Sequence, residues 1–144
     1  MAAGMNAPLY TTEILRLAAA LPEPARLERV DATAEKRSPT CGSTIAVALT
    51  LSADGKVEAL SQRVHACAFG QAAATLMARA ALGCDRQRAE TALAALEAWL
   101  AGKRDDPGDW PGVAALAPVR SRQSRHGAVL LPFAALAAAL ERSR

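Results

Sequence analysis

The stretch TIAVALTLSADGKVEALSQRVHAC, from Thr44 to Cys67, decides the fold of this chain. Over 44–51, large apolar residues alternate with smaller ones, which is the two-residue period of a strand with one buried face. Asp54 and Gly55 then form the dipeptide typical of a tight hairpin, so we expect 57–65 to return antiparallel to the first strand. The stretch therefore predicts a β-hairpin that ends beside a cysteine.

The segments around this hairpin predict one more strand and several helices. The polar pattern of 26–37 is consistent with an edge strand, and 38–43 reads as a turn. Apolar residues recur at helical spacing over 8–18, 69–80, 85–100 and 127–140, which predicts four helices. A polar loop is expected at 102–112. This order predicts an α+β fold, in which a small three-stranded antiparallel β-sheet is packed by about five helices on one side.

Length and composition favour a single domain over 1–144. A hydrophobic fraction of 51% excludes a disordered chain, and a net charge of only +3 gives no reason to expect a nucleic-acid partner. The longest apolar run, Val129 to Leu140, is shorter than the roughly 18 to 20 residues that cross a membrane, and the first 25 residues do not resemble a secretory signal. We therefore expect a cytoplasmic protein with no membrane partner.

The sequence shows no machinery of a common enzyme class. It has no glycine-rich phosphate loop, no serine nucleophile with a base at a recognisable spacing, and no paired carboxylates on one helix face. Arg120, Arg122 and Arg125 form a short basic cluster without interleaved aromatic residues, which is more typical of a solvated surface than of a nucleic-acid site. We expect a protein that is not an enzyme.

Three cysteines carry the chemistry, and an odd number in a reducing compartment indicates thiols or metal ligands. Cys67 lies where a strand passes into a helix, and a thiolate there faces unpaired backbone N–H groups that stabilise its charge. Cys41 lies in the turn before the first strand, so the hairpin is expected to bring the two thiols together. Cys84 follows Gly83 at a helix junction and is expected to be a small buried hydrophobe. The same packing role is the alternative interpretation of Cys41 and Cys67.

Two histidines are candidate further ligands. His65 precedes Cys67 by two residues on the strand, so the two side chains could share a face. His126 follows the basic cluster, where it is either solvated or brought to the same pocket by the last helix. Two thiolates with imidazoles suit tetrahedral zinc as well as iron.

The segments PTCG at 39–42 and HACAFGQAAA at 65–74 resemble two of the three cysteine motifs of the iron-sulfur cluster assembly scaffolds of the IscU/NifU amino-terminal (SufU-like) type. The resemblance covers nearly the whole chain. It implies a scaffold on which sulfur from a cysteine desulfurase and iron form a labile [2Fe-2S] cluster, which is then passed to iron-sulfur acceptor proteins. It also implies that Cys41 and Cys67 bind this iron or cluster.

The sequence departs from the family pattern at two ligand positions. Ser43 stands where the family usually has an aspartate. The third cysteine is replaced by Ala128 in the gapless register, or by Gln123 in a register that aligns 116–120 with the Leu-Pro-Pro-Val-Lys chaperone-recognition motif. In that second register, 116–120 is expected to be an exposed loop that binds a chaperone, although a plain connection between helices is the alternative.

A cluster needs four ligands, normally thiolates, and the matched positions of one chain supply two. A homodimer would supply four thiolates, or a histidine would complete a mononuclear iron or zinc site. The remaining alternative is a degenerate scaffold that binds zinc or only the protein partners of the assembly machinery.

Overall fold

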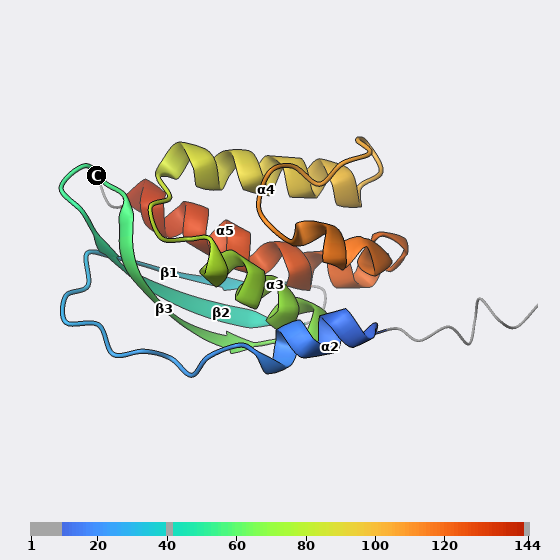
Figure 1. The fold of residues 1–144 in the computed structure, drawn as a ribbon, viewed down its shortest axis with the longest axis horizontal. Coiled ribbons are helices and arrows are strands. Elements are labelled where there is room, and N and C mark those ends of the chain that lie inside the picture. Colours follow the sequence, from blue (N-terminus) through green and yellow to red (C-terminus); the bar gives the residue numbers. More distant parts are fainter. Residues whose placement is uncertain (1–9, 40–41, 143–144) are drawn as a thin grey trace, which may run out of the picture.

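A three-stranded antiparallel sheet forms one layer of the molecule (Figure 1). The computed structural model describes residues 10–39 and 42–142. The strands are β1 (Ala32–Arg37), β2 (Thr44–Leu51) and β3 (Val57–His65), in the spatial order β1-β2-β3.

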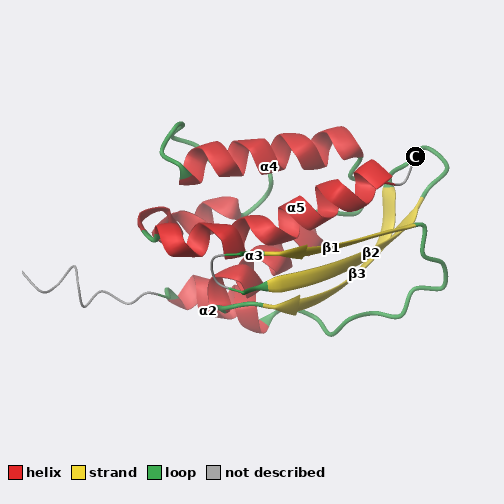
Figure 2. Cartoon of the chain, turned by 180° about the vertical axis from the view of Figure 1, so that it is seen from behind, coloured by secondary structure: helices red, strands yellow, loops and turns green. Residues whose placement is uncertain are grey.

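The second layer is helical and covers one face of the sheet (Figure 2). The described residues form the α-helices α2 (Thr12–Ala19), α3 (Ala68–Arg79), α4 (Arg86–Leu100) and α5 (His126–Arg142), and the 3-10 helices η1 (Val113–Ser121) and η2 (Gln123–Arg125). Helix α5 packs on β1 and β2, and α4 and α3 pack on α5. The predicted α+β class, with its small antiparallel sheet and its helices, is confirmed.

The predicted hairpin is confirmed, because β2 and β3 begin and end at the expected residues. Every second residue of β2, from Ile45 to Leu51, is buried. The backbone N–H of Ser52 donates to the carbonyl of Lys56 at 2.8 Å, and Gly55 has a φ of 81°. That left-handed conformation is accessible to glycine without steric cost, which explains the Asp-Gly signal. The alternating side chains and the turn together fix the register.

Helix α3 forms the centre of the core, because its residues 72–77 are all buried. The small side chains of Ala72, Ala73 and Ala74 let neighbouring elements approach closely. The Thr75 hydroxyl donates to the carbonyl of Leu17 at 2.7 Å, which ties α2 to α3. The ring of Tyr10 lies 4.8 Å from that of Phe69, which is fully buried in the first turn of α3. The opening helix therefore docks on α3, where the cysteine motif begins.

The loop at 102–112 is less polar than its sequence suggests. The prediction of a loop there is confirmed, but Trp110 is 4% exposed. Its indole N–H donates to the carbonyl of Leu76 at 2.9 Å, and its ring meets the ring of Phe133 edge to face. The hydrogen bond compensates for burying the indole N–H, and the ring contact adds to the favourable burial of the indole. This loop is therefore tied to the core by its tryptophan.

The expectation of an exposed loop at 116–120 is wrong. The segment belongs to η1, and Leu116 and Val119 are fully buried. A 3-10 helix has three residues per turn, so Val113, Leu116 and Val119 lie on one face and pack into the core. Pro118 lacks an N–H, yet it lies inside η1, which spans nine residues.

Within residues 10–39 and 42–142, no helix combines the length and the apolar character that crossing a membrane requires.

Candidate metal centre

Cys67 lies at the start of α3, as the sequence predicts. It is the N-cap residue, with an extended backbone and a half-buried side chain, and its carbonyl accepts from the N–H of Gln71 at 2.9 Å. The side chain of Gln71 donates to the carbonyl of Ala66 at 3.0 Å, so the turn before the helix is also held. The first turn of α3 contains no acidic residue. A thiolate at this position meets the positive end of the helix dipole.

The first turns of α3 and α5 touch each other at Gly70 and Ala128. A Cβ atom built on Gly70 would lie 3.2 Å from the carbonyl oxygen of Ala128 and 3.4 Å from its Cβ. It would also lie 2.6 Å from the Cβ of Ala66, which is closer than real Cβ contacts. Ala128 itself is fully buried. Glycine at 70 therefore permits the close approach of the two helix ends.

The turn that precedes β2 lies against the same end of α5. The backbone N–H of Ser38 donates to the carbonyl of Ser43 at 2.8 Å, and Gly42 N–H donates to the carbonyl of Ser38 at 3.0 Å. A Cβ built on Gly127 would lie 2.6 Å from the Ser38 hydroxyl oxygen. Both serines are buried. The segments that flank Cys41 therefore pack beside α5, although Cys41 itself lies outside the described residues.

Three segments distant in sequence thus meet at one end of the sheet. Thr44 pairs with His65, so the start of β2 lies beside the end of β3 and the N-terminus of α3. The contacts of Gly70 and Gly127 bring the start of α5 to the same place. This arrangement favours the register that aligns Ala128 with the family's third cysteine, because the alternative residue, Gln123, is exposed at the start of η2.

His65 lies at this end of the sheet but is exposed. Residues paired directly across an antiparallel sheet point to the same face. His65 therefore shares a face with Thr44 and Arg37, and this face is the one that the helices leave open. Its imidazole is accessible from solvent, close in sequence to Cys67.

His126 is the first residue of α5, but it does not face the start of α3. Its Nε2 lies 3.0 Å from the carbonyl of Val119 and 3.1 Å from that of Arg120. Both partners are acceptors, so Nε2 carries the proton and is occupied by the backbone of η1. His126 also lines a hollow with residues of α4, whereas Ala128 faces α3. The structure therefore does not bring His126 together with Cys67.

Cys84 lies away from this end of the molecule. It is fully buried, and its thiol donates to the carbonyl of Asp85 at 3.3 Å. Burial raises its pKa from 9.0 to about 11. A thiol with this pKa is protonated at neutral pH, which makes it a poor metal ligand. This environment is that of a packing residue.

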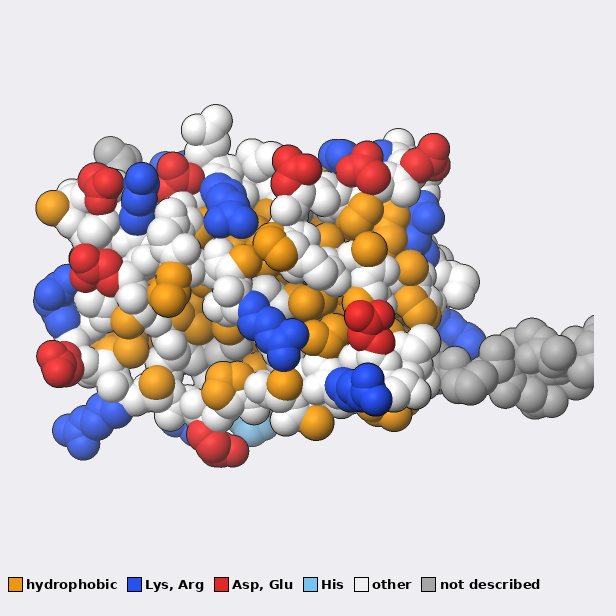
Figure 3. Space-filling model, in the orientation of Figure 1, with side chains coloured by type: hydrophobic (Ala, Val, Ile, Leu, Met, Phe, Trp, Pro, Cys, Tyr) orange, Lys and Arg blue, Asp and Glu red, His pale blue; other side chains and the backbone are white. Residues whose placement is uncertain are grey.

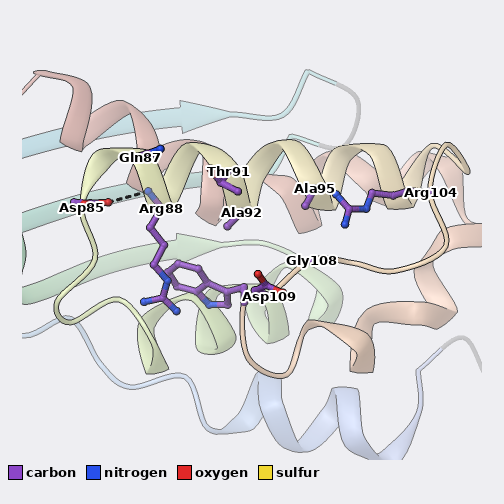
Figure 4. Close-up of a pocket in the computed structure, with 10 residues that line it drawn as sticks. Asp85, Gln87, Arg88, Thr91, Ala92, Ala95, Arg104, Gly108 and Asp109 are labelled. Carbon is purple, nitrogen blue, oxygen red and sulfur yellow. Dashed lines mark hydrogen bonds between the residues drawn. The ribbon is translucent and has the colours of Figure 1, made fainter.

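A groove of about 430 Å³ lies between α4 and the loop before η1 (Figure 4). The guanidinium of Arg88 lies over the ring of Trp110 at 4.6 Å, and Arg104 lines the other end of the groove. The groove is lined by no cysteine or histidine, so it is separate from the candidate metal centre.

The donor set around Cys67 is sparse. Among residues 10–39 and 42–142, no group of three His, Cys, Asp or Glu side chains could hold a metal ion. Ala128 has no donor atom, and the hydroxyl of Ser43 is a weak substitute for a carboxylate. Among the described groups that suit iron or zinc, the thiol of Cys67 and the imidazole of His65 lie at this end of the sheet.

Sequence reasoning missed the structural role of Gly70 and Gly127. Both glycines permit close contacts between segments, and glycine inside a helical pattern is the signal for such an approach. The partner of each glycine could not be predicted from local pattern, because Ala128 is 58 residues from Gly70 and Ser38 is 89 residues from Gly127.

Gly70→Val is expected to lower the free energy of unfolding by about 1–3 kcal/mol, the usual cost of overpacking. The added side chain has no room between Ala66 and Ala128. Urea unfolding followed by circular dichroism measures the effect. Ala94→Val, on the exposed face of α4, is the matched control and should cost less than about 1 kcal/mol. Equal midpoints for the two variants would contradict the close approach of α3 and α5.

Comparisons with known proteins agree with this geometry. The chain matches no protein-family model and no curated protein sequence. It is similar to the crystal structure of a nitrogen-fixing NifU-like protein (N-terminal) from Brucella abortus, with 32% sequence identity and a TM-score of 0.85. The similarity covers 92% of each chain.

Two further solved structures share the fold. One is a putative iron-sulfur cluster assembly scaffold protein for the SUF system from Fervidobacterium islandicum AW-1, with 21% identity and a TM-score of 0.82 over 92% of this chain and 96% of the other. The other is a hypothetical protein with 20% identity and a TM-score of 0.71 over 93% of this chain and 98% of the other.

Proposed function

This chain belongs to the family of NifU-like amino-terminal proteins, and from that premise we propose that it acts as a scaffold in iron-sulfur cluster assembly. In this proposal it binds iron or a labile [2Fe-2S] cluster through Cys41 and Cys67. The cluster is cargo, which the chain holds and then releases to acceptor proteins. The chain performs no reaction of its own on a small-molecule substrate.

One observation carries the proposal: the start of α3, with Cys67 as its N-cap, packs against the start of α5 and lies beside the start of β2. These are the segments in which the family resemblance puts its three ligand motifs. The side chain of Cys67 lies at the positive end of the α3 dipole, and its half-buried position leaves access for a metal and for a partner.

The ligand count indicates how the cargo is held. A [2Fe-2S] cluster takes four ligands, and this chain contributes the two thiolates of Cys41 and Cys67. Two copies of the chain would complete the set with four thiolates. Within one copy, His65 is the better candidate for a third ligand of iron or zinc, because Nε2 of His126 is already engaged by η1.

The partners follow from the chemistry of the cargo. A cysteine desulfurase supplies the sulfur, and apoproteins that need iron-sulfur clusters accept the product. An assembly chaperone is a further candidate partner, but 116–120 offers it little surface because Leu116 and Val119 are buried. Arg120 is also held in place, since its Nε donates to the carbonyl of Trp99 at 3.0 Å.

A second candidate function is that of a degenerate scaffold that binds zinc or only its protein partners. Ala128 favours this alternative, because a fully buried methyl group occupies the position of the third cysteine and supplies no ligand atom. Ser43 favours it as well, since it replaces the family's aspartate.

Anaerobic reconstitution of the purified chain with ferrous iron and sulfide tests the proposal. We expect about one iron and one sulfide per chain, as two chains share one cluster, together with visible absorbance from thiolate-to-iron charge transfer. Size-exclusion chromatography should then show a dimer that reverts to monomer on chelation. Zinc in the protein as isolated, with no iron bound after reconstitution, would favour the second candidate. Absence of both metals would leave only the protein-partner role.

A further inference from the structure

Gln71 holds both of the peptide groups that flank the α-carbon of Cys67. Its backbone N–H donates to the carbonyl of Cys67 at 2.9 Å, and its side-chain Nε2 donates to the carbonyl of Ala66 at 3.0 Å. The Ala66 carbonyl belongs to the peptide before Cys67, and the Cys67 carbonyl belongs to the peptide after it. Because peptide groups are planar, the orientations of these two fix φ and ψ of Cys67, which are −67° and 174°.

The side chain of Cys67 does not fix its own direction. Cys67 is the N-cap of α3, but its thiol makes no capping hydrogen bond. A serine or an aspartate at an N-cap accepts from the backbone N–H groups of the first turn and is held by them. The thiol is therefore left available to a metal, and the direction of its Cα–Cβ bond depends on the backbone that Gln71 holds.

Glycine at position 70 makes room for this arrangement. A Cβ atom built on Gly70 would lie 2.6 Å from the Cβ of Ala66, so a larger residue would push Ala66 away from the helix. With glycine there, the carbonyl of Ala66 stays within reach of the amide of Gln71. Gly70 and Gln71 therefore act together on the residue that precedes Cys67.

Gln71 is itself anchored by the core. Residues 72–77, which follow it in α3, are all buried, and the Thr75 hydroxyl lies 3.1 Å from the carbonyl of Gln71. Hydrophobic side chains gather over the middle of the face on which α2 and α3 lie, and most acidic side chains lie along its rim (Figure 3). A partly buried hydrogen bond in such surroundings competes less with water than one at an open surface.

We propose that Gln71 is a positioning residue of the cargo site, which holds the thiolate of Cys67 in the direction that iron or a cluster requires. This inference rests on the proposed function and adds to it the residue that controls the geometry of one ligand. A ligand that is already held in its bound direction loses less conformational freedom when it binds. Release of the Ala66 peptide is therefore expected to weaken retention of the cargo without unfolding the chain.

Gln71→Met tests this inference, because methionine has a similar length and helix propensity but no N–H to donate. After anaerobic reconstitution, we expect iron to be lost to a chelator at least about tenfold faster, the scale of effect that outer-shell partners of a metal have. The visible circular dichroism of the cluster should change as well, since it reports the geometry of the thiolate-to-iron bonds. Gln71→Asn keeps the amide but is one methylene shorter, so it should behave like Gln71→Met.

Gln87→Met is the matched control. Gln87 is exposed in the first turn of α4, and its side chain makes no hydrogen bond within residues 10–39 and 42–142. Hydrogen exchange of the metal-free proteins gives a second measurement that does not depend on cargo. The amide of Gln71 should exchange faster in Gln71→Asn than in the unchanged protein, because the first turn of α3 opens more often. Gln87→Met should leave it unchanged.

The outcomes separate this inference from the proposed function. Equal rates of iron loss in the unchanged protein and in the variants at 71 overturn the positioning role and leave the scaffold proposal intact. Faster iron loss with unchanged exchange in the first turn of α3 also overturns it, because the hold on Cys67 is then not the cause. If far-ultraviolet circular dichroism shows that Gln71→Met is unfolded, the comparison is made with Gln71→Asn. Absence of iron from the unchanged protein counts against the scaffold proposal and overturns both.

Discussion

Cys41→Ser and Cys67→Ser are each expected to reduce bound iron or zinc to background after anaerobic reconstitution. A serine hydroxyl stays protonated at neutral pH and is a poor ligand for a metal that prefers sulfur. Removal of either thiolate leaves one cysteine in each chain at the candidate centre, so even a dimer supplies only half of the four ligands. Metal analysis and the visible absorbance of the cluster measure the loss.

Cys84→Ser is the matched control for these variants. Its thiol is fully buried and protonated, away from the start of α3, so its replacement should leave the metal content unchanged. It is expected to cost some stability, because a serine hydroxyl in that position is more polar than a thiol. Circular dichroism should show that all three variants are folded. Equal retention of metal by all three would rule out Cys41 and Cys67 as the ligands.

Ala128→Cys is expected to make the bound cluster markedly more stable. Ala128 contacts Gly70 at the start of α3, so a thiolate at 128 enters the same end of the molecule as Cys67. Three thiolates per chain leave only one of the four ligands to be supplied, for which His65 is the candidate, so one copy can hold the cluster without sharing it. We expect loss of iron to a chelator to slow by at least about tenfold, the scale of effect that even outer-shell partners of a metal have.

Gln123→Cys is the control that distinguishes the two sequence registers. Gln123 is exposed in η2, so a cysteine there is expected to leave the rate of iron loss unchanged. Cluster-to-protein stoichiometry provides a second measurement, with a shift from one cluster per two chains toward one per chain only in Ala128→Cys. A slower loss of iron in Gln123→Cys alone would favour the other register.

The fold followed from local signals in the sequence. The alternation of β2, the Asp-Gly turn and the helix after Cys67 each depend on residues close in the chain, so their limits were predicted almost to the residue. Asp85 caps α4 in the same local way, since its carboxylate accepts from the backbone N–H of Arg88 at 2.9 Å. Signals of this kind reflect backbone preferences and the burial of one face, which act within a single element.

The segments around η1 were misread for a related reason. Leu116 and Val119 are three positions apart, a spacing that suits a 3-10 helix, but the alignment of 116–120 with the chaperone-recognition motif suggested a loop. Trp110 stands among polar residues, and its burial depends on the carbonyl of Leu76 and the ring of Phe133. Whether such residues are buried depends on partners that are distant in sequence.

The sequence by itself determined the strand hairpin, the position of Cys67 at the start of a helix and the family resemblance that this helix carries. Only the tertiary structure decided that Ala128 meets Gly70 while His126 turns toward η1. It also decided that Arg37 and Arg63 share the open face of the sheet. The physical reason is that periodicity fixes which residues share a face of one element, whereas the packing of several elements fixes what that face meets.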